Sequence, residues 1–141
     1  MRSGTRDRKA LVVLSDGGDN ASYRKLDDVL QIAQRSSATI YTIGIYDETD
    51  ADRNPGVLKK IATQSGGRAY FPESLNHLDQ VWRDIAGRIR SQYTIGYSST
   101  NPRRDGAFRR VKISASRDGG RSLRVTSRDG YIAPAETTVP K

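Results

Sequence analysis

The residues of this sequence that could do chemistry gather in one short loop, Ser15-Asp16-Gly17-Gly18-Asp19-Asn20. The loop follows the apolar run at residues 10–14, which is typical of a strand covered on both faces of a parallel sheet. Ligands of open α/β sheets bind beyond the carboxyl ends of strands, and carboxylates are ligands for Mg²⁺ and Ca²⁺. Asp16 is therefore a candidate metal ligand, although Asp-Gly is also a common turn pair. One carboxylate alone predicts weak binding.

Other site chemistries find little support, and we expect a protein that is not an enzyme. The sequence has no cysteine, which excludes disulfides, thiol catalysis and zinc–thiolate sites. Ser15 is interpreted as a strand-end hydroxyl, because no G-x-S-x-G motif surrounds it and the single histidine, His77, opens a helix far along the chain. The Gly17-Gly18 pair lacks the lysine of a phosphate-binding loop, and the acidic residues at 47–52 lack the spacing of a calcium-binding EF-hand.

The net charge of +8 lies at the two ends of the chain. Residues 11–101 carry 10 Lys and Arg against 11 Asp and Glu, whereas residues 102–130 carry 9 against 3. A basic hairpin at 103–128 could bind nucleic acid or another polyanion, or it could be a charged, solvated sheet face. Few aromatic residues accompany it, mainly Phe108 and Tyr131, which disfavours stacking on single strands. Affinity that falls steeply with salt would indicate phosphate contacts, whereas loss with a chelator would indicate a metal bridge.

Strands and helices alternate over residues 9–90, which predicts a parallel sheet with helices on its faces. Strands are expected at 10–14, 39–45 and 68–71, and Gly44 suggests that a neighbouring group passes close to the second strand. Helices are expected after the loop, from a start at Asn54-Pro55 with the proline near the first position, and after a cap at Ser74 or Asn76. The apolar positions of these helices are Leu26, Val29, Leu30 and Ala33; Leu58, Ile61 and Ala62; and Leu75, Leu78, Trp82, Ile85 and Ile89, with Trp82 expected in the core.

The pattern changes after residue 91 to one typical of antiparallel hairpins. The segments QYTIGY, FRRVKISASR and RSLRVTSRDGYI alternate polar and apolar residues. Turns are expected at the Asp-Gly pairs 105–106, 118–119 and 129–130. Val111, Ile113 and Ala115 are expected on one face, opposite Arg110, Lys112 and Ser114.

The segments LVVLSDGGDN, IYTIGI and LKKIATQSGGRAYF, in this order, resemble the second half of a von Willebrand factor type A domain. The segment QYTIGYSSTNPRRDGAFRRVKI and the ending RDGYIAP resemble the region that comes after that domain in the bacterial group described as "VWFA-related". The resemblance implies a doubly wound, mostly parallel, Rossmann-like sheet followed by an antiparallel β appendage. It divides the chain into a C-terminal half-domain at 1–91, a β extension at 92–133 and a flexible tail at 134–141.

The resemblance also implies a binding and adhesion module with a metal-ion-dependent adhesion site. In the family this site uses an Asp-x-Ser-x-Ser motif, a Thr and a later Asp, and Asp16 matches that later Asp. Nothing in the sequence matches the other ligands, so the site is expected to be incomplete, with Asp19 as a further possible ligand. Mg²⁺ or another divalent cation is the implied cofactor of a full-length relative, with tight binding not expected here. A partner protein would add an acidic side chain and contact Ser15, Gly17 and Asn20.

The family's first strand lies beside its fourth, the strand that residues 10–14 resemble. If the first strand is missing, strand 10–14 has a bare apolar edge, which favours self-association. We expect the early Met1 to reflect a truncated gene model. The start MRSGTRDRKA has no apolar segment of a signal peptide and no run approaches a membrane span. The resemblance implies an extracytoplasmic or secreted full-length protein.

Overall fold

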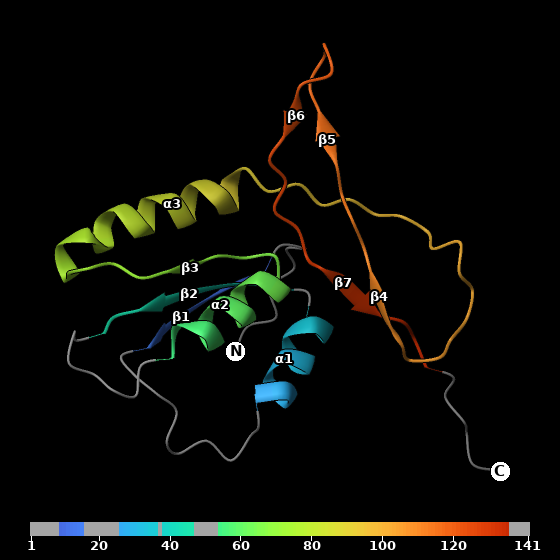
Figure 1. The fold of residues 1–141 in the computed structure, drawn as a ribbon, viewed down its shortest axis with the longest axis horizontal. Helices are drawn as coiled ribbons and strands as arrows, with labels where there is room; N and C mark the ends of the chain where they lie inside the picture. Colours follow the sequence, from blue (N-terminus) through green and yellow to red (C-terminus); the bar gives the residue numbers. More distant parts are fainter. Residues whose placement is uncertain (1–8, 16–25, 37, 47–53, 136–141) are drawn as a thin grey trace.

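A three-stranded parallel sheet forms the centre of the larger part of the molecule (Figure 1). The structure is a computed structural model, and it describes residues 9–15, 26–36, 38–46 and 54–135. The strands are β1 (Lys9–Ser15), β2 (Ala38–Gly44) and β3 (Ala69–Tyr70), in the order β1-β2-β3. Lys9 lies beside Ala38 and Ser15 beside Gly44, so β1 and β2 pair along their whole lengths. The predicted parallel α/β arrangement is confirmed.

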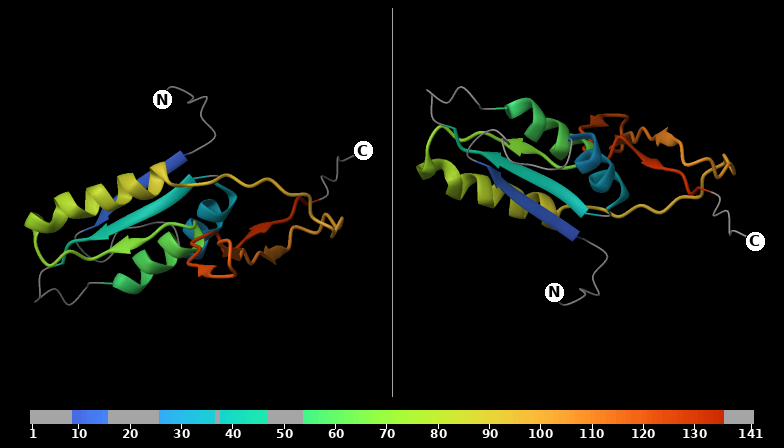
Figure 2. Two further views of the ribbon diagram at one scale, coloured as in Figure 1. Left: turned by 90° about the horizontal axis from the view of Figure 1, so that it is seen from above. Right: turned by 90° about the horizontal axis from the view of Figure 1, so that it is seen from below.

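Helices cover both faces of this sheet (Figure 2). On one face α1 (Leu26–Arg35) lies against α2 (Pro55–Gln64), where the Gln34 side-chain amide donates a hydrogen bond to the Gln64 side chain at 3.3 Å. On the other face a short 3₁₀ turn, η1 (Leu75–His77), leads into α3 (Leu78–Arg90). The helix α2 begins at Pro55, as predicted, and Asn54 caps it: its side-chain oxygen accepts a hydrogen bond from the Val57 N–H at 3.3 Å.

The strand β2 is the most deeply buried element of the core. Its side chains alternate between the two helical layers, as the period of a strand requires. Tyr41 and Ile43 pack with Val81 and Ile85 of α3. On the opposite face, the buried Thr42 hydroxyl donates to the Leu58 carbonyl of α2 at 3.1 Å. The residues of β2 from Thr39 onward are all buried, so both layers depend on this one strand.

The expectation that β1 is covered on both faces is wrong. The strand forms over the predicted residues, but none of its residues is buried. Leu11 is 50% exposed and Leu14 is 60% exposed. The reason is that β1 pairs only with β2, and no described strand lies on its other side. A fully apolar run therefore forms an edge strand, whose Val12 still packs against the α3 cluster.

The predicted apolar face of α3 is wrong in part. The buried residues are Val81 and Ile85, with Leu78 and Ile89 packed partly against them. Trp82, expected in the core, is 45% exposed, and Leu75 is 66% exposed in η1. The helix presents the stripe that contains Val81 to the sheet, which turns Trp82 outward onto one flank. Ser74 begins the 3₁₀ turn without a side-chain cap hydrogen bond.

The Ser65-Gly66-Gly67 turn joins α2 to β3 and completes the hydrogen bonding of β2. The buried Ser65 hydroxyl accepts the Ile40 N–H at 2.9 Å and donates to the Ala62 carbonyl at 2.8 Å. Since β3 begins only at Ala69, no residue of β3 is paired with Ile40. A Cβ at Gly67 would collide with the Ile40 carbonyl oxygen, so the chain passes there only as glycine.

An antiparallel ribbon follows α3. It pairs β4 (Phe108–Arg110) with β7 (Gly130–Ile132), and β5 (Ala115–Ser116) with β6 (Ser122–Leu123). A tight turn at 117–120 joins β5 to β6, close to the predicted Asp-Gly turn. Two expectations are wrong. The segment QYTIGY, expected to be part of a hairpin, forms no strand, and its Tyr93 is 88% exposed. Gly130, expected in a turn, lies in β7, where a Cβ would collide with the Arg109 carbonyl.

The hydroxyl of Ser65 generates the first prediction. Replacing Ser65 by Ala leaves the buried Ile40 N–H without its acceptor, so the free energy of unfolding should fall by about 1–3 kcal/mol. Ser91→Ala is the matched control, because its hydroxyl also bonds a helix carbonyl but lies exposed. Urea unfolding followed by circular dichroism measures both variants. Equal losses for the two serines would contradict this role of Ser65.

Candidate functional site

The carboxyl ends of the three strands define the edge where the sequence predicts a site. The strand β1 ends at Ser15, whose carbonyl accepts the Ile45 N–H at 2.9 Å, and β2 ends beside it at Gly44. Ser15 is half-buried at this edge. The other predicted site residues, Asp16, Gly17, Asp19 and Asn20, lie outside the described residues, as does the acidic segment 47–52. The structure therefore places Ser15 and the end of the strand that leads into Asp16.

An aromatic pair lies over the end of β2. The rings of Tyr46 and Phe71 stack with centroids 6.0 Å apart and planes 17° from parallel. A Cβ at Gly44 would collide with both rings, which confirms the predicted close approach at this glycine. The Lys59 ammonium lies 5.4 Å from the centre of the Phe71 ring. These contacts link the ends of β2 and β3 to α2.

A small polar network lies between β3 and α3. The Tyr70 hydroxyl donates to the Asp84 carboxylate at 2.6 Å, and the Arg88 Nε donates to the same oxygen at 2.9 Å. Burial, together with the hydrogen bond to Asp84, raises the pKa of Tyr70 to about 12. The hydrogen bonds from Tyr70 and Arg88 lower the pKa of the Asp84 carboxyl. A hollow of about 460 Å³ adjoins this network.

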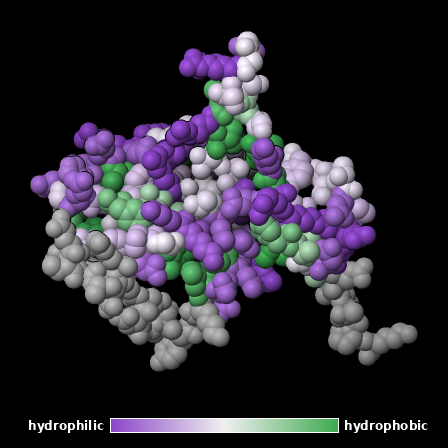
Figure 3. Space-filling view, viewed as in Figure 1, coloured by the Kyte–Doolittle hydropathy of each residue, from purple (hydrophilic) through white to green (hydrophobic). Residues whose placement is uncertain are grey.

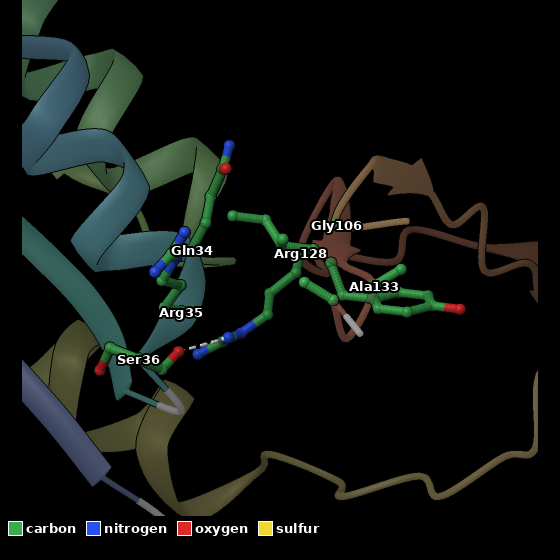
Figure 4. A pocket seen from close by; sticks show the side chains of 9 residues that line it. Gln34, Arg35, Ser36, Gly106, Arg128 and Ala133 are labelled. Atoms are coloured by element: carbon green, nitrogen blue, oxygen red, sulfur yellow. Dashed lines mark hydrogen bonds between the residues drawn. The ribbon is translucent and has the colours of Figure 1, made fainter. Parts of the chain in front are cut away.

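A second hollow, of about 530 Å³, separates the ribbon from the end of α1 (Figure 4). The Arg128 guanidinium crosses it and donates to the Ser36 carbonyl at 2.6 Å and the Ala38 carbonyl at 2.8 Å. Burial lowers the pKa of Arg128. Because Ala38 is the first residue of β2, the ribbon docks at the amino ends of the strands. That end is opposite to the edge where Ser15 lies.

The basic hairpin at 103–128 does not present all of its cations to solvent. The Arg109 guanidinium donates to the Asn101 carbonyl at 2.7 Å and to the Arg103 carbonyl, and it lies 3.5 Å from the Asp105 carboxylate. The Arg128 guanidinium is likewise bound to main-chain carbonyls. Ile113, predicted to share a face with Val111 and Ala115, is 39% exposed, whereas Val111 and Ala115 are partly covered.

In Figure 3 hydrophilic side chains cover most of α3, and the hydrophobic ones lie in separate patches.

Within the described ranges no group of three or more His, Asp or Glu residues could hold a metal ion. Helices long and apolar enough to cross a bilayer are also not found in these ranges. Tyr70, Asp84 and Arg88 form a polar cluster, but the Asp84 carboxylate is already bound by the Tyr70 hydroxyl and the Arg88 guanidinium. This cluster therefore offers no open set of oxygen ligands.

The sequence model of the von Willebrand factor type A domain matches residues 1–84. The chain belongs to the von Willebrand factor type A family. The match spans all three parallel strands and about the first half of α3, and it ends before the ribbon. No curated protein matches the chain. Domains of this family are generally interaction modules without catalytic activity, which agrees with the expected class of function.

One solved structure with a similar fold is described as the crystal structure of an uncharacterized membrane spanning protein from Vibrio fischeri. It is 26% identical to this von Willebrand factor type A chain over the matched region, with a TM-score of 0.52. The match covers 56% of the present chain and 46% of that chain. The present chain thus spans about half the length of that protein.

Two features of these sites were missed from the sequence. The Asp84–Arg88 pair could have been found, because opposite charges four residues apart on a helix are neighbours. Its partner Tyr70 could not, because the contact depends on how α3 crosses the sheet. The role of Arg128 could not be predicted, because nothing in the sequence distinguishes it from the other arginines of the basic segment.

The Tyr70 network generates the second prediction. The raised pKa of Tyr70, about 12 against an ordinary value near 10, means that its contribution to stability is present below about pH 10 and is lost as the pH rises through about 12. Asp84→Asn should lower the pKa of Tyr70 but leave it above 10, since burial is the largest cause. Titration of the tyrosine NMR signals measures this, with Asp79→Asn as the control. A pKa of Tyr70 that Asp84→Asn leaves unchanged would contradict the network.

Proposed function

We propose that this chain is a non-catalytic protein-binding module of the von Willebrand factor type A kind, with an incomplete divalent-metal site centred on Asp16. The observation that carries the proposal is the position of Ser15 at the carboxyl end of a parallel strand, directly ahead of Asp16. In open α/β sheets this edge is where ligands bind. The proposal includes the doubly wound, Rossmann-like arrangement of the complete domain, of which β1, β2 and β3 would be the last three parallel strands.

Asp16 would supply one carboxylate oxygen to Mg²⁺, with Asp19 as a possible second ligand. Among the described residues no group of three or more acids adds further ligands. This donor set fits only a weak site, because Mg²⁺ requires near-octahedral oxygen coordination. An acidic side chain of a partner protein would complete the shell, while Ser15, Gly17 and Asn20 contact that partner. Binding of metal and partner would then depend on each other.

The docking of the ribbon supports this proposal. Arg128 holds the ribbon at the amino ends of the strands, through the Ser36 and Ala38 carbonyls. The described ribbon therefore does not occupy the opposite edge, where a partner would bind. We further propose that the full-length protein works outside the cytoplasm, in adhesion or in the assembly of a complex.

Binding of nucleic acid through residues 103–128 stays a prediction and is not carried forward as a second function. A phosphate-binding strip needs free guanidinium groups along one face. Two of the arginines in the segment, Arg109 and Arg128, bind main-chain carbonyl oxygens of the chain itself. No contact of the described ribbon favours this alternative.

The metal site generates the third prediction. Mn²⁺ added to the chain as a paramagnetic probe should broaden the NMR signals of Ser15, Ile45 and Tyr46 first, because these residues lie at the same strand ends. Asp16→Ala should abolish this local broadening, and excess Mg²⁺ should compete with it. Asp118→Ala is the control, since this exposed acid lies on the turn of the ribbon. Broadening that survives Asp16→Ala, or that spreads equally over all acidic residues, would contradict the proposed site.

A further inference from the structure

Three Asp-Gly pairs among the described residues carry a chemistry that the proposed function does not use. They are Asp105-Gly106, Asp118-Gly119 and Asp129-Gly130, and a fourth pair, Asp16-Gly17, lies outside the described residues. In such a pair the main-chain nitrogen of the glycine can attack the carboxyl carbon of the aspartate, because glycine has no side chain to hinder the approach. The main chain must rotate about the aspartate for this attack, so the local structure decides whether the reaction proceeds.

Hydrogen bonds restrain both residues of the first pair. The Asp105 carboxylate accepts the Ala107 N–H at 3.0 Å and lies 3.5 Å from the Arg109 guanidinium. The hydrogen bond from Ala107, followed by the charge of Arg109, lowers the pKa of Asp105, which disfavours the protonated carboxyl that loses water most readily. The attacking group, the Gly106 N–H, donates to the Pro134 carbonyl at 3.4 Å. Ring closure at this pair would break these bonds.

The strands of the ribbon fix the third pair. Gly130 is the first residue of β7 and lies beside Arg110 of β4. The Asp129 carbonyl accepts the Val111 N–H at 2.9 Å, which holds the peptide group between Asp129 and Gly130 in place. Gly130 is buried, and main-chain atoms of Arg109 lie so close that a Cβ would collide with them. The main chain therefore has little room to rotate at this pair.

The second pair lies in the turn between β5 and β6, at the tip of the ribbon that projects from the molecule (Figure 1). Both Asp118 and Gly119 are exposed, and a Cβ at Gly119 would meet open space. The Arg117 N–H donates to the Arg121 carbonyl and the Gly120 N–H to the Arg117 carbonyl, both on either side of the pair. Neither of these bonds uses the peptide group between Asp118 and Gly119. This pair lacks the restraints that hold the other two.

We propose that Asp118 is a modification site, at which the folded chain converts aspartate into isoaspartate through a cyclic imide with Gly119. A bond forms between the Gly119 nitrogen and the side-chain carboxyl carbon of Asp118, while the carboxyl hydroxyl and the amide proton leave as water. Water then adds to the main-chain carbonyl carbon of Asp118, and the bond from that carbon to the Gly119 nitrogen breaks. The chain now runs through the former side-chain carboxyl carbon, and the former main-chain carbon carries the free carboxylate. One water is lost and one is gained, so the conversion is balanced without a co-reactant.

The product changes the tip of the ribbon and creates a group that an enzyme can recognise. Isoaspartate adds one carbon to the main chain between Arg117 and Gly120, which would displace the hydrogen bond that closes the turn. Its free carboxylate is the substrate of carboxyl methyltransferases that act on isoaspartyl residues and transfer a methyl group from a sulfonium donor. The partner implied by this site is an enzyme of that class. The inference does not use the metal site, so the two fail separately.

Ageing of the whole chain tests the proposal. In residues 1–141 kept folded at mildly acidic pH for several weeks, isoaspartate should form at Asp118 at least about tenfold faster than at Asp105 or Asp129, which must first open locally. Peptide mapping by mass spectrometry with electron-transfer fragmentation locates the isoaspartate, and an isoaspartyl methyltransferase with a labelled methyl donor measures its amount. Asp118→Glu should remove the product at this position, because glutamate would have to form a larger ring. Asp129→Glu is the matched control and should leave the rate at Asp118 unchanged.

The unfolded chain provides the second arm of the test. In concentrated urea the three pairs lose their restraints and should form isoaspartate at similar rates. Equal rates at the three pairs in the folded chain, or a methylation signal that Asp118→Glu does not reduce, would overturn the proposal. An equally strong preference for Asp118 in urea would also overturn it, since the neighbouring sequence and not the turn would then be the cause.

Discussion

The burial of β2 between two helical layers is the interaction on which the rest of this structure depends. Tyr41 and Ile43 hold α3 on one face, while Thr42 binds α2 on the other. In the described sheet β2 alone has a strand on each side. Burial of these side chains is the main source of stability, and the main-chain groups of β2 must all be paired for it to be favourable. The Ser65 hydroxyl meets that requirement at Ile40, whose N–H has no partner in β3.

The same constraint leaves β1 with one neighbour. Strands of a parallel sheet are normally buried on both faces, whereas β1, with one neighbour among the described strands, exposes Leu11 and Leu14. The proposed metal site lies beyond the carboxyl end of this strand. The ribbon, which Arg128 holds at the amino ends of the strands, does not cover that end.

Local patterns in the sequence predicted the elements well and their surroundings less well. The runs at 10–14 and 39–45 form strands, as predicted. The burial of β1 and Trp82 was predicted wrongly, because apolar character shows that a residue can be buried and not that a neighbour is present. The Tyr70–Asp84 contact was invisible, since it depends on the crossing of α3 and β3. Asp16, the central residue of the proposed metal site, stays a prediction.

The most direct test of the described sheet order is amide hydrogen exchange along β1, measured by NMR in dilute protein. We predict an alternating pattern, because the N–H groups of Leu11, Val13 and Ser15 bond to β2, whereas those of Ala10, Val12 and Leu14 face solvent. Slow exchange only at the first three residues would establish β1 as a strand with one neighbour. Slow exchange at all six residues would contradict the account, since a second neighbour would then pair with β1.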